Sequence, residues 1–137
     1  MISIRRIYDP PVRGEGQRFL VDRLWPRGVA KSRVGRHRWV PEVAPSRELR
    51  LWYGHDPTRW KTFRARYLKE LKARPEAVAP LIRATRKHSI VLLYAAADGA
   101  HSNAAVLRDY LRRHARSRSR SDKPASGMLS RKRRAPG

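Results

Sequence analysis

Apolar runs along the chain predict two buried strands separated by a block of helices. The runs are Phe19-Leu20-Val21 and Ser89 to Tyr94, the pattern typical of parallel strands covered on both faces. Ile2-Ser3-Ile4 alternates between apolar and polar residues and leads into residues 5–8, which predicts a shorter first strand that stops before Asp9-Pro10-Pro11. Strands and helices in this order favour an α/β fold, a small layered domain with a mainly parallel sheet flanked by helices.

The middle of the chain predicts three amphipathic helices with recognisable start signals. Ser46 is placed to cap a first helix that ends at Gly54, and Asp56-Pro57 begins the second. Pro75 opens the third, in which Pro80 predicts either a kink or a later start.

The four tryptophans fall into two groups. Three of them are expected in the core: Trp39, Trp52 and Trp60. Pro41, close behind Trp39, allows only an irregular or edge strand there. Trp25 lies in a turn instead, where it packs under the loop or stacks on a flat ligand.

The C-terminal part of the chain predicts a disordered basic tail. A last helix is expected over residues 104–114, so we divide the chain into an α/β domain, residues 1–114, and a tail, residues 115–137. From Arg116 the tail alternates arginine with serine and offers almost nothing that could be buried.

The chain is strongly basic, with 33 Lys and Arg against 11 Asp and Glu and a net charge of +22. Residues 112–137 hold ten of the bases and one acid, so both parts of the chain are basic. Nucleic acid is therefore a candidate partner, above all for Arg116 to Arg134. Arginine outnumbers lysine 26 to 7, which a GC-rich genome also produces, so the excess charge has two explanations.

Several classes of protein are excluded or disfavoured. The absence of cysteine excludes disulfides, thiolate catalysis and cysteine-ligated metals. The N-terminus lacks a signal-peptide pattern, and the longest apolar run, Ile90 to Ala97, is far shorter than the ~20 residues that span a bilayer. No phosphate-loop, dinucleotide-binding or paired-histidine metal motif is present. We expect a cytoplasmic protein with no metal, no cofactor and no membrane partner.

Charged and polar residues follow both apolar strands, at the place where open α/β sheets bind ligands. If the two strands are neighbours, these residues line one crevice: Asp22, Arg23, Trp25, Arg27, Tyr94, His101 and Asn103. Arginine forks and the N-terminus of the last helix suit a phosphate or carboxylate.

Two of these residues are candidates for catalysis. They are Asp22 and His101, because an imidazole can act as an acid or base near neutral pH. The other five are candidate ligand contacts, as is His55, which has no structural role between Gly54 and Asp56 and is otherwise a solvent-facing residue. In the alternative interpretation, Asp22 forms a structural ion pair with an arginine, and His101 and Asn103 cap the helix.

Several segments together closely resemble the YeaO-like family, a bacterial domain of unknown function (DUF488). They include Val21-Asp-Arg-Leu-Trp-Pro-Arg-Gly28, Trp52-Tyr-Gly-His-Asp-Pro57 and Leu92-Leu-Tyr-Ala-Ala96, within a match over about residues 2–111. The resemblance implies a compact α/β domain and no established activity. The basic tail lies outside the family pattern.

Three functions remain open. The leading hypothesis is a small α/β protein that binds a small anion in the crevice, with enzymatic activity undecided. The second is a nucleic-acid-binding protein that uses its basic surface and tail. The third is an interaction module without chemistry.

Overall fold

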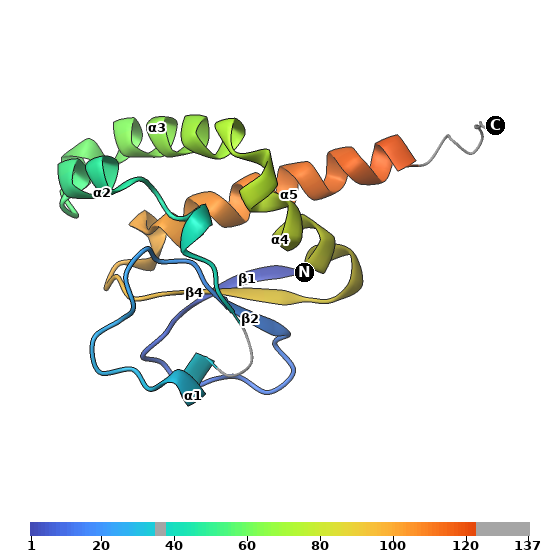
Figure 1. Cartoon of the computed structure of the whole chain (residues 1–137), viewed down its shortest axis with the longest axis horizontal. Helices are drawn as coiled ribbons and strands as arrows, with labels where there is room; N and C mark the ends of the chain where they lie inside the picture. The colour runs from blue at the N-terminus through green and yellow to red at the C-terminus, as the bar shows by residue number, and fades with distance from the viewer. Residues whose placement is uncertain (35–37, 123–137) are drawn as a thin grey trace.

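A four-stranded parallel sheet organises the protein, whose computed structural model describes residues 1–34 and 38–122 (Figure 1). The strands are β1 (Ile2–Arg6), β2 (Gln17–Leu20), β3 (Arg38–Trp39) and β4 (Ile90–Tyr94). Their order in the sheet is β1-β4-β2-β3, and all three neighbouring pairs are parallel. The structure therefore confirms the predicted α/β fold and parallel sheet.

The central strand β4 pairs with both β1 and β2, and all five of its residues are buried. Its side chains alternate between two clusters: Leu92 belongs to the main core and Leu93 to a smaller cluster on the other face. Leu20 of β2 lies opposite Leu93. The two apolar strands expected from the sequence are thus neighbours, and their C-terminal ends meet at one edge of the sheet.

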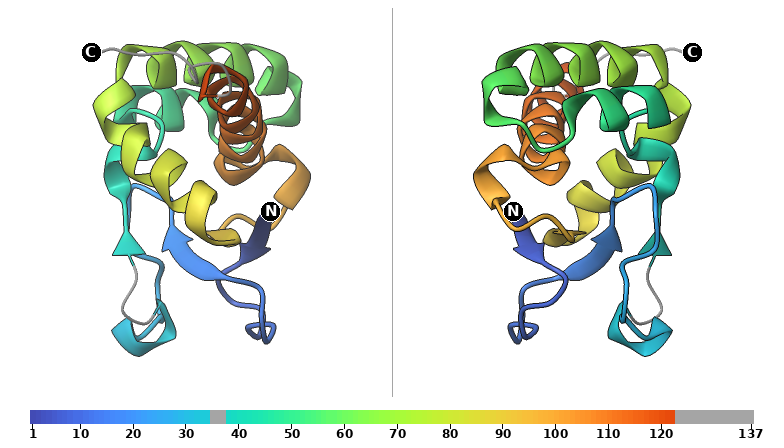
Figure 2. Two further views of the ribbon diagram at one scale, coloured as in Figure 1. Left: turned by 90° about the vertical axis from the view of Figure 1, so that its right-hand side faces the viewer. Right: turned by 90° about the vertical axis from the view of Figure 1, so that its left-hand side faces the viewer.

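Most of the helices cover one face of the sheet (Figures 1 and 2). They are α2 (Arg47–Tyr53), α3 (Trp60–Ala73), α4 (Pro75–Lys87) and α5 (Asn103–Asp122). The short helix α1 (Lys31–Val34) lies on the opposite side. Three 3₁₀ helices complete the description: η1 (Pro41–Val43), η2 (Pro57–Arg59) and η3 (Gly99–His101).

The helix start and stop signals act as the sequence predicts. The Ser46 hydroxyl accepts a hydrogen bond from the Leu49 N–H, and Gly54 ends α2 in the left-handed conformation at φ 52°. The Asp56 carboxylate accepts from the Thr58 N–H at the start of η2, which leads directly into α3. These caps place the chain between α2 and α3 in a tight elbow.

Two helices differ from expectation at their ends. Helix α4 begins at Pro75 and continues through Pro80, so it does not start late. Helix α5 runs to Asp122 instead of ending near residue 114. Residues 115–122, expected to be disordered, are helical because arginine and alanine are good helix formers. The rest of the expected tail, residues 123–137, lies outside the described residues.

Trp39 does not lie in the core, although Trp52 and Trp60 pack against it. Its side chain is 42% exposed on the edge strand β3, and its indole N–H donates to the Asp22 carbonyl at 2.8 Å. The edge position explains the exposure, because β3 has a neighbour on one side only. The prediction of an edge strand here is confirmed.

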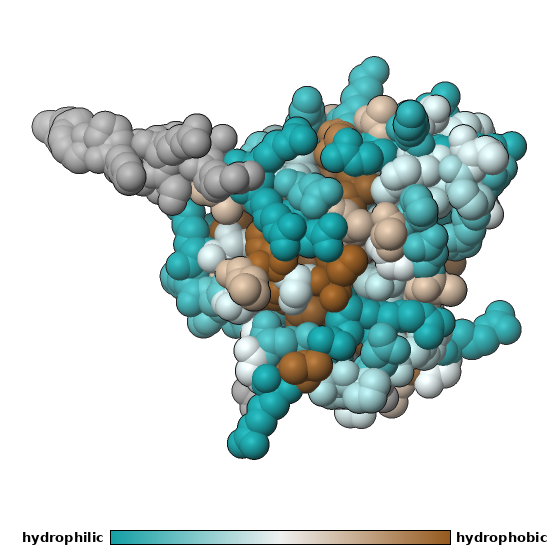
Figure 3. Space-filling view, turned by 180° about the vertical axis from the view of Figure 1, so that it is seen from behind, coloured by the Kyte–Doolittle hydropathy of each residue, from teal (hydrophilic) through white to brown (hydrophobic). Residues whose placement is uncertain are grey.

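The surface is largely hydrophilic. Figure 3 shows the face opposite to that of Figure 1, where hydrophilic residues surround a hydrophobic patch near the centre. Within the described ranges, no helix combines the length and the apolar character needed to cross a membrane.

Candidate functional site

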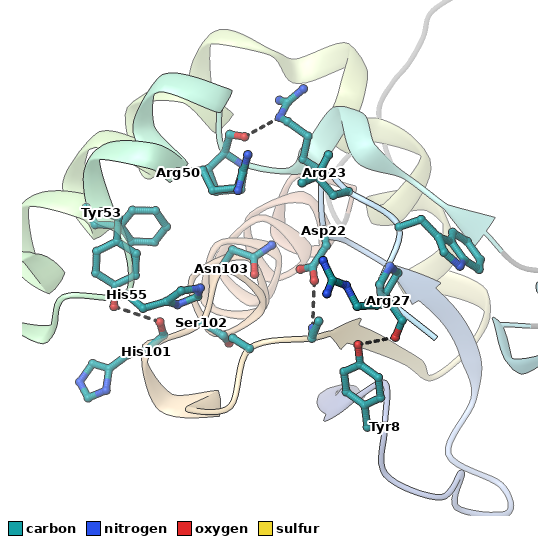
Figure 4. A pocket seen from close by; sticks show the side chains of 17 residues that line it. Tyr8, Asp22, Arg23, Arg27, Arg50, Tyr53, His55, His101, Ser102 and Asn103 are labelled. Carbon is teal, nitrogen blue, oxygen red and sulfur yellow. Dashed lines mark hydrogen bonds between the residues drawn. The ribbon is translucent and has the colours of Figure 1, made fainter. Parts of the chain in front are cut away.

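A cavity of about 300 Å³ lies at the C-terminal ends of β2 and β4 (Figure 4). Its walls come from residues 22–27 after β2, residues 95–96 after β4, helix α2 and the start of α5. We call it the strand-end pocket. Seven of the eight residues that the sequence predicted for a site line it: Asp22, Arg23, Trp25, Arg27, His55, His101 and Asn103.

Tyr94 is the predicted residue that the structure places elsewhere. Its side chain is only 7% exposed and belongs to the main core, and its ring and hydroxyl lie where a side chain on Gly99 would otherwise be. The alternation of β4 directs it there, since Ile90 and Leu92 share the same face. Burial raises the pKa of the Tyr94 hydroxyl. Tyr94 thus supports the pocket from the core and does not line it.

Asp22 connects the ends of the strands. Its carboxylate accepts a hydrogen bond from the Ala95 N–H at 2.9 Å, just after β4, while its carbonyl accepts from Trp39 of β3. Burial raises the pKa of the Asp22 carboxyl, against the hydrogen bonds from Ala95 and Asn103 and the attraction of His55. Among the described residues, Asp22 forms no ion pair with an arginine. The alternative of a structural Asp22–arginine pair is therefore wrong.

Arg23 and Arg27 reach the pocket from the loop after β2. The Arg23 guanidinium donates to two carbonyls before α2, from Nε to Pro45 at 2.9 Å and from Nη2 to Ala44 at 3.4 Å. Arg27 is exposed, and its carbonyl accepts a hydrogen bond from the Tyr8 hydroxyl at 2.9 Å. Main-chain contacts thus hold both residues at the pocket without using a carboxylate.

Arg50 is a pocket residue that the sequence interpretation missed. It lies in the last turn of α2, and its Nε is the one buried side-chain nitrogen or oxygen without a hydrogen-bond partner among the side chains that the structure describes. An unpaired buried polar group costs roughly 1–3 kcal/mol, and more when it is charged. Arg50 lies three residues before Tyr53, which is buried, and residues at this spacing share one face of a helix. This spacing could have placed Arg50 on the inner face of α2.

His55 faces the pocket because of an uncommon backbone conformation. It has φ 58° and follows Gly54 at φ 52°, so two successive left-handed residues turn the chain after α2. Histidine is one of the few side chains found there with some frequency. Figure 4 shows the imidazole directed into the pocket, and its ring centroid lies 5.9 Å from that of Tyr53.

His101 has a different environment, although it lines the same pocket. Its Nδ1 lies 2.6 Å from the Asp98 carboxylate, and its ring meets Trp60 edge-on at a centroid distance of 5.0 Å. The hydrogen bond with His101 lowers the pKa of Asp98. Figure 4 shows the His101 imidazole turned away from Asp22, while its carbonyl accepts from the Tyr53 hydroxyl.

The start of α5 is fastened to the end of β2. The Asn103 side-chain amide donates to the Val21 carbonyl at 2.9 Å. Ser102 caps the helix, since its hydroxyl accepts from the Ala105 N–H at 3.2 Å. The prediction that His101 and Asn103 cap this helix is therefore wrong, and Asn103 serves as a link between helix and sheet.

The pocket combines cationic and apolar walls. Among the residues that the structure describes, three arginines line it against one carboxylate, that of Asp22, and hydrophobic contacts come from Leu24, Pro26 and Phe63. Guanidinium groups suit phosphate and carboxylate oxygens. Within the ranges that the structure describes, no cluster of three or more His, Asp or Glu side chains could hold a metal ion.

Comparison with known proteins identifies relatives over most of the chain. A family model described as "Inactive DUF488-N3 subclade" matches residues 1–129, so the expectation that the basic tail lies outside the family pattern is wrong for residues 115–129. The chain is 39% identical to "Uncharacterized protein YeaO" of Escherichia coli K12 over 111 residues, which cover 81% of this chain and 96% of that protein. It is 41% identical over 112 residues to "Uncharacterized protein Rv3073c" of Mycobacterium tuberculosis, covering 80% and 92% of the two chains. No solved structure matches significantly. The chain therefore belongs to the YeaO-like DUF488 family.

Proposed function

We propose that the protein binds a small anion, with a phosphate or carboxylate group, in the strand-end pocket. The observation that carries this proposal is Arg50, which lines the pocket and whose buried Nε has no hydrogen-bond partner among the described residues. A ligand oxygen in the pocket would pair with this guanidinium, and burial strengthens the resulting charge-assisted hydrogen bond.

The charges around Arg50 support the same proposal. Arg27 adds a second guanidinium, and Arg23 a third. Asp22 is hydrogen-bonded to the Ala95 N–H instead of to an arginine, so the acid of the pocket does not neutralise its cations through a contact. A bound anion would supply the missing negative charge.

The proposal is one of binding without chemistry. The His101 imidazole engages Asp98 and Trp60 and is turned away from Asp22, so the two candidate catalytic groups do not face each other. The word "inactive" in the description of the matching family model agrees with binding alone. Catalytic roles for Asp22 and His101 stay predictions.

Thermal unfolding in phosphate tests the proposal. The melting temperature of the full chain is measured with increasing sodium phosphate and, at equal ionic strength, sodium chloride. Because a ligand that binds only the folded state stabilises it by about 2.7 kcal/mol at a hundred times its Kd, phosphate should raise the melting temperature by several degrees more than chloride.

Two substitutions locate the effect. Arg50→Gln removes the unpaired cation and should abolish the extra stabilisation by phosphate. Arg83→Gln on α4 removes the same charge from an exposed position outside the pocket and should leave it unchanged. An equal phosphate effect in Arg50→Gln and the parent protein would overturn the proposal.

A second candidate function, nucleic-acid binding, is favoured by one observation on the surface. Two exposed guanidinium groups lie over the indole of Trp52. The guanidinium carbon is 5.1 Å from the ring centroid for Arg59 and 4.8 Å for Arg66. Stacking on an indole holds an arginine in a defined position. The neighbouring surface of α3 carries further exposed bases: Lys61, Lys69 and Lys72.

Fluorescence anisotropy with a labelled single strand and a duplex tests this candidate at low salt. Arg66→Gln should weaken binding to both and reduce its salt dependence, because each phosphate contact releases counterions. Arg83→Gln serves as the charge-matched control on another helix. Binding that responds equally to both substitutions would reflect net charge and not this surface.

A further inference from the structure

The size of the strand-end pocket carries information about its ligand. A cavity of about 300 Å³ has the space of about ten waters, since one water takes roughly 30 Å³ in the liquid. A bare phosphate has only five heavy atoms, which are covalently bonded and so occupy less space than five separate waters, and it would fill less than about half of that volume. The pocket is therefore larger than an inorganic anion requires.

Part of the lining of the pocket is apolar. Leu24 lines the pocket and is 59% exposed, so its side chain is accessible to a ligand. The next residue, Trp25, donates its indole N–H to the Val29 carbonyl at 2.7 Å. Because this donor is already used, the Trp25 side chain can offer a ligand only its apolar ring. Pro26 and Phe63 also line the cavity.

We propose that the ligand is an organic anion: a phosphate or carboxylate head joined to an apolar body about as large as a phenyl ring. Arg50 binds the head, and Leu24 and Trp25 contact the body. This inference rests on the proposed function, because it assigns a second, apolar half to the same site. A ligand of this kind pairs with the Arg50 guanidinium and covers the exposed Leu24 in one binding event.

Isothermal titration of the full chain with phenyl phosphate, inorganic phosphate and phenol tests this inference. Phenyl phosphate should bind at least about tenfold more tightly than inorganic phosphate, since burying a side chain the size of leucine or phenylalanine is worth that or more. Phenol, which lacks the anionic head, should not bind measurably at the same concentrations.

A matched pair of leucine substitutions separates the apolar wall from the general surface. Leu24→Ser should weaken phenyl phosphate binding about fivefold or more and leave inorganic phosphate binding unchanged. Leu51→Ser changes a leucine of nearly equal exposure, 57%, that lies on α2 outside the lining of the pocket. It should change neither affinity. Both positions are exposed, so circular dichroism should show both variants folded.

The outcomes distinguish the two proposals. If neither phosphate nor phenyl phosphate binds, the proposed function itself fails. If both bind with equal affinity, the anion site stands and the apolar half of the inference is overturned. The inference also fails if Leu24→Ser weakens both ligands equally, or if Leu51→Ser has the same effect as Leu24→Ser.

Discussion

At the scale of single residues, Asp22 controls the charge of the strand-end pocket. Its carboxylate is fixed by the Ala95 N–H, and burial raises its pKa above the usual value. The folded protein therefore holds this proton to a higher pH than the unfolded chain does. The contribution of Asp22 to stability falls as the pH rises from its ordinary pKa to the raised one.

Asp22→Asn should strengthen anion binding. The substitution removes a negative charge beside the bound anion, and a unit charge at 4 Å is worth about 1 kcal/mol even in water, so we expect at least about fivefold higher affinity near neutral pH. The asparagine carbonyl can still accept from the Ala95 N–H, which preserves the fold. Titration calorimetry with sulfate, whose charge is constant from pH 5 to pH 8, measures the change.

The pH dependence gives a second test of the same substitution. In the parent protein, sulfate affinity should rise as the pH falls through the raised pKa of Asp22. Asp22→Asn should lack this rise, because the asparagine amide does not titrate. Parallel pH profiles for the two proteins would contradict the role of Asp22.

His55→Gly should be more stable than His55→Ala by about 1 kcal/mol. Both variants lose the imidazole, but only glycine adopts φ 58° without the steric cost that a left-handed residue with a Cβ carries, about 1–2 kcal/mol. Urea unfolding of the two variants measures the difference. Equal stability would mean that the chain relaxes out of the left-handed conformation when the histidine is removed.

The sequence predicted the site residues unevenly, for physical reasons. Residues 22–27 could be predicted because they come just after a strand, where the sequence changes abruptly from apolar to charged residues. Arg50 escaped notice because arginines are common on helix surfaces, and only the fold turns this one inward. The relative orientation of His55 and His101 depends on the backbone at His55 and on the bond to Asp98, neither of which the residue pattern reveals.

At the scale of elements, two hydrogen bonds between the start of α2 and helix α3 position Arg50. The Ser46 N–H and hydroxyl both donate to the Glu70 carboxylate of α3, at 2.7 Å and 2.6 Å. The same hydroxyl caps α2. Ser46 therefore fixes where α2 begins and how it lies against α3, and Arg50 follows one turn later.

Ser46→Ala should lower the free energy of unfolding by about 2 kcal/mol. The loss combines a helix cap, about 1 kcal/mol, with a hydrogen bond to a charged acceptor, about 1.5–3 kcal/mol, partly offset because Glu70 keeps the main-chain donor. Ser32→Ala on α1 is the control, since Ser32 is exposed, and should change stability by less than about 0.5 kcal/mol. Equal losses in the two variants would contradict the role of the link between α2 and α3.

The elements themselves were predictable where local chemistry determines them. Ser46, Gly54 and Asp56 act as caps in the structure as in the sequence interpretation. Helix ends were less predictable, because a proline at Pro80 and a basic stretch after residue 114 are each compatible with continuing or stopping a helix. Tertiary packing and intrinsic propensity decide between these possibilities.

At the scale of the whole molecule, two apolar runs were enough to predict a parallel α/β sheet. The residues of these two runs do not indicate which strands are neighbours in the sheet. A strand shows the same apolar pattern whichever strand it pairs with. The order β1-β4-β2-β3 depends on how the helices between residues 47 and 87 cross one face. The strand-end pocket depends on this order, which brings Val21 and Tyr94 to the same edge.

The position of β4 between β1 and β2 has a consequence for how the chain folds. β1 and β2 do not pair with each other. Ile2 of β1 pairs with Ile90 of β4, which lies far along the sequence. A nascent chain therefore completes most of its sheet only after its last strand leaves the ribosome, and pairing over so long a sequence separation slows folding. We expect a fragment of residues 1–89 to lack the dispersed amide signals of a folded protein in NMR spectra, whereas the full chain shows them. Until β4 is available, β1 has no partner strand and β2 can pair only with the two-residue strand β3, and this interval is when the protein is most exposed to aggregation.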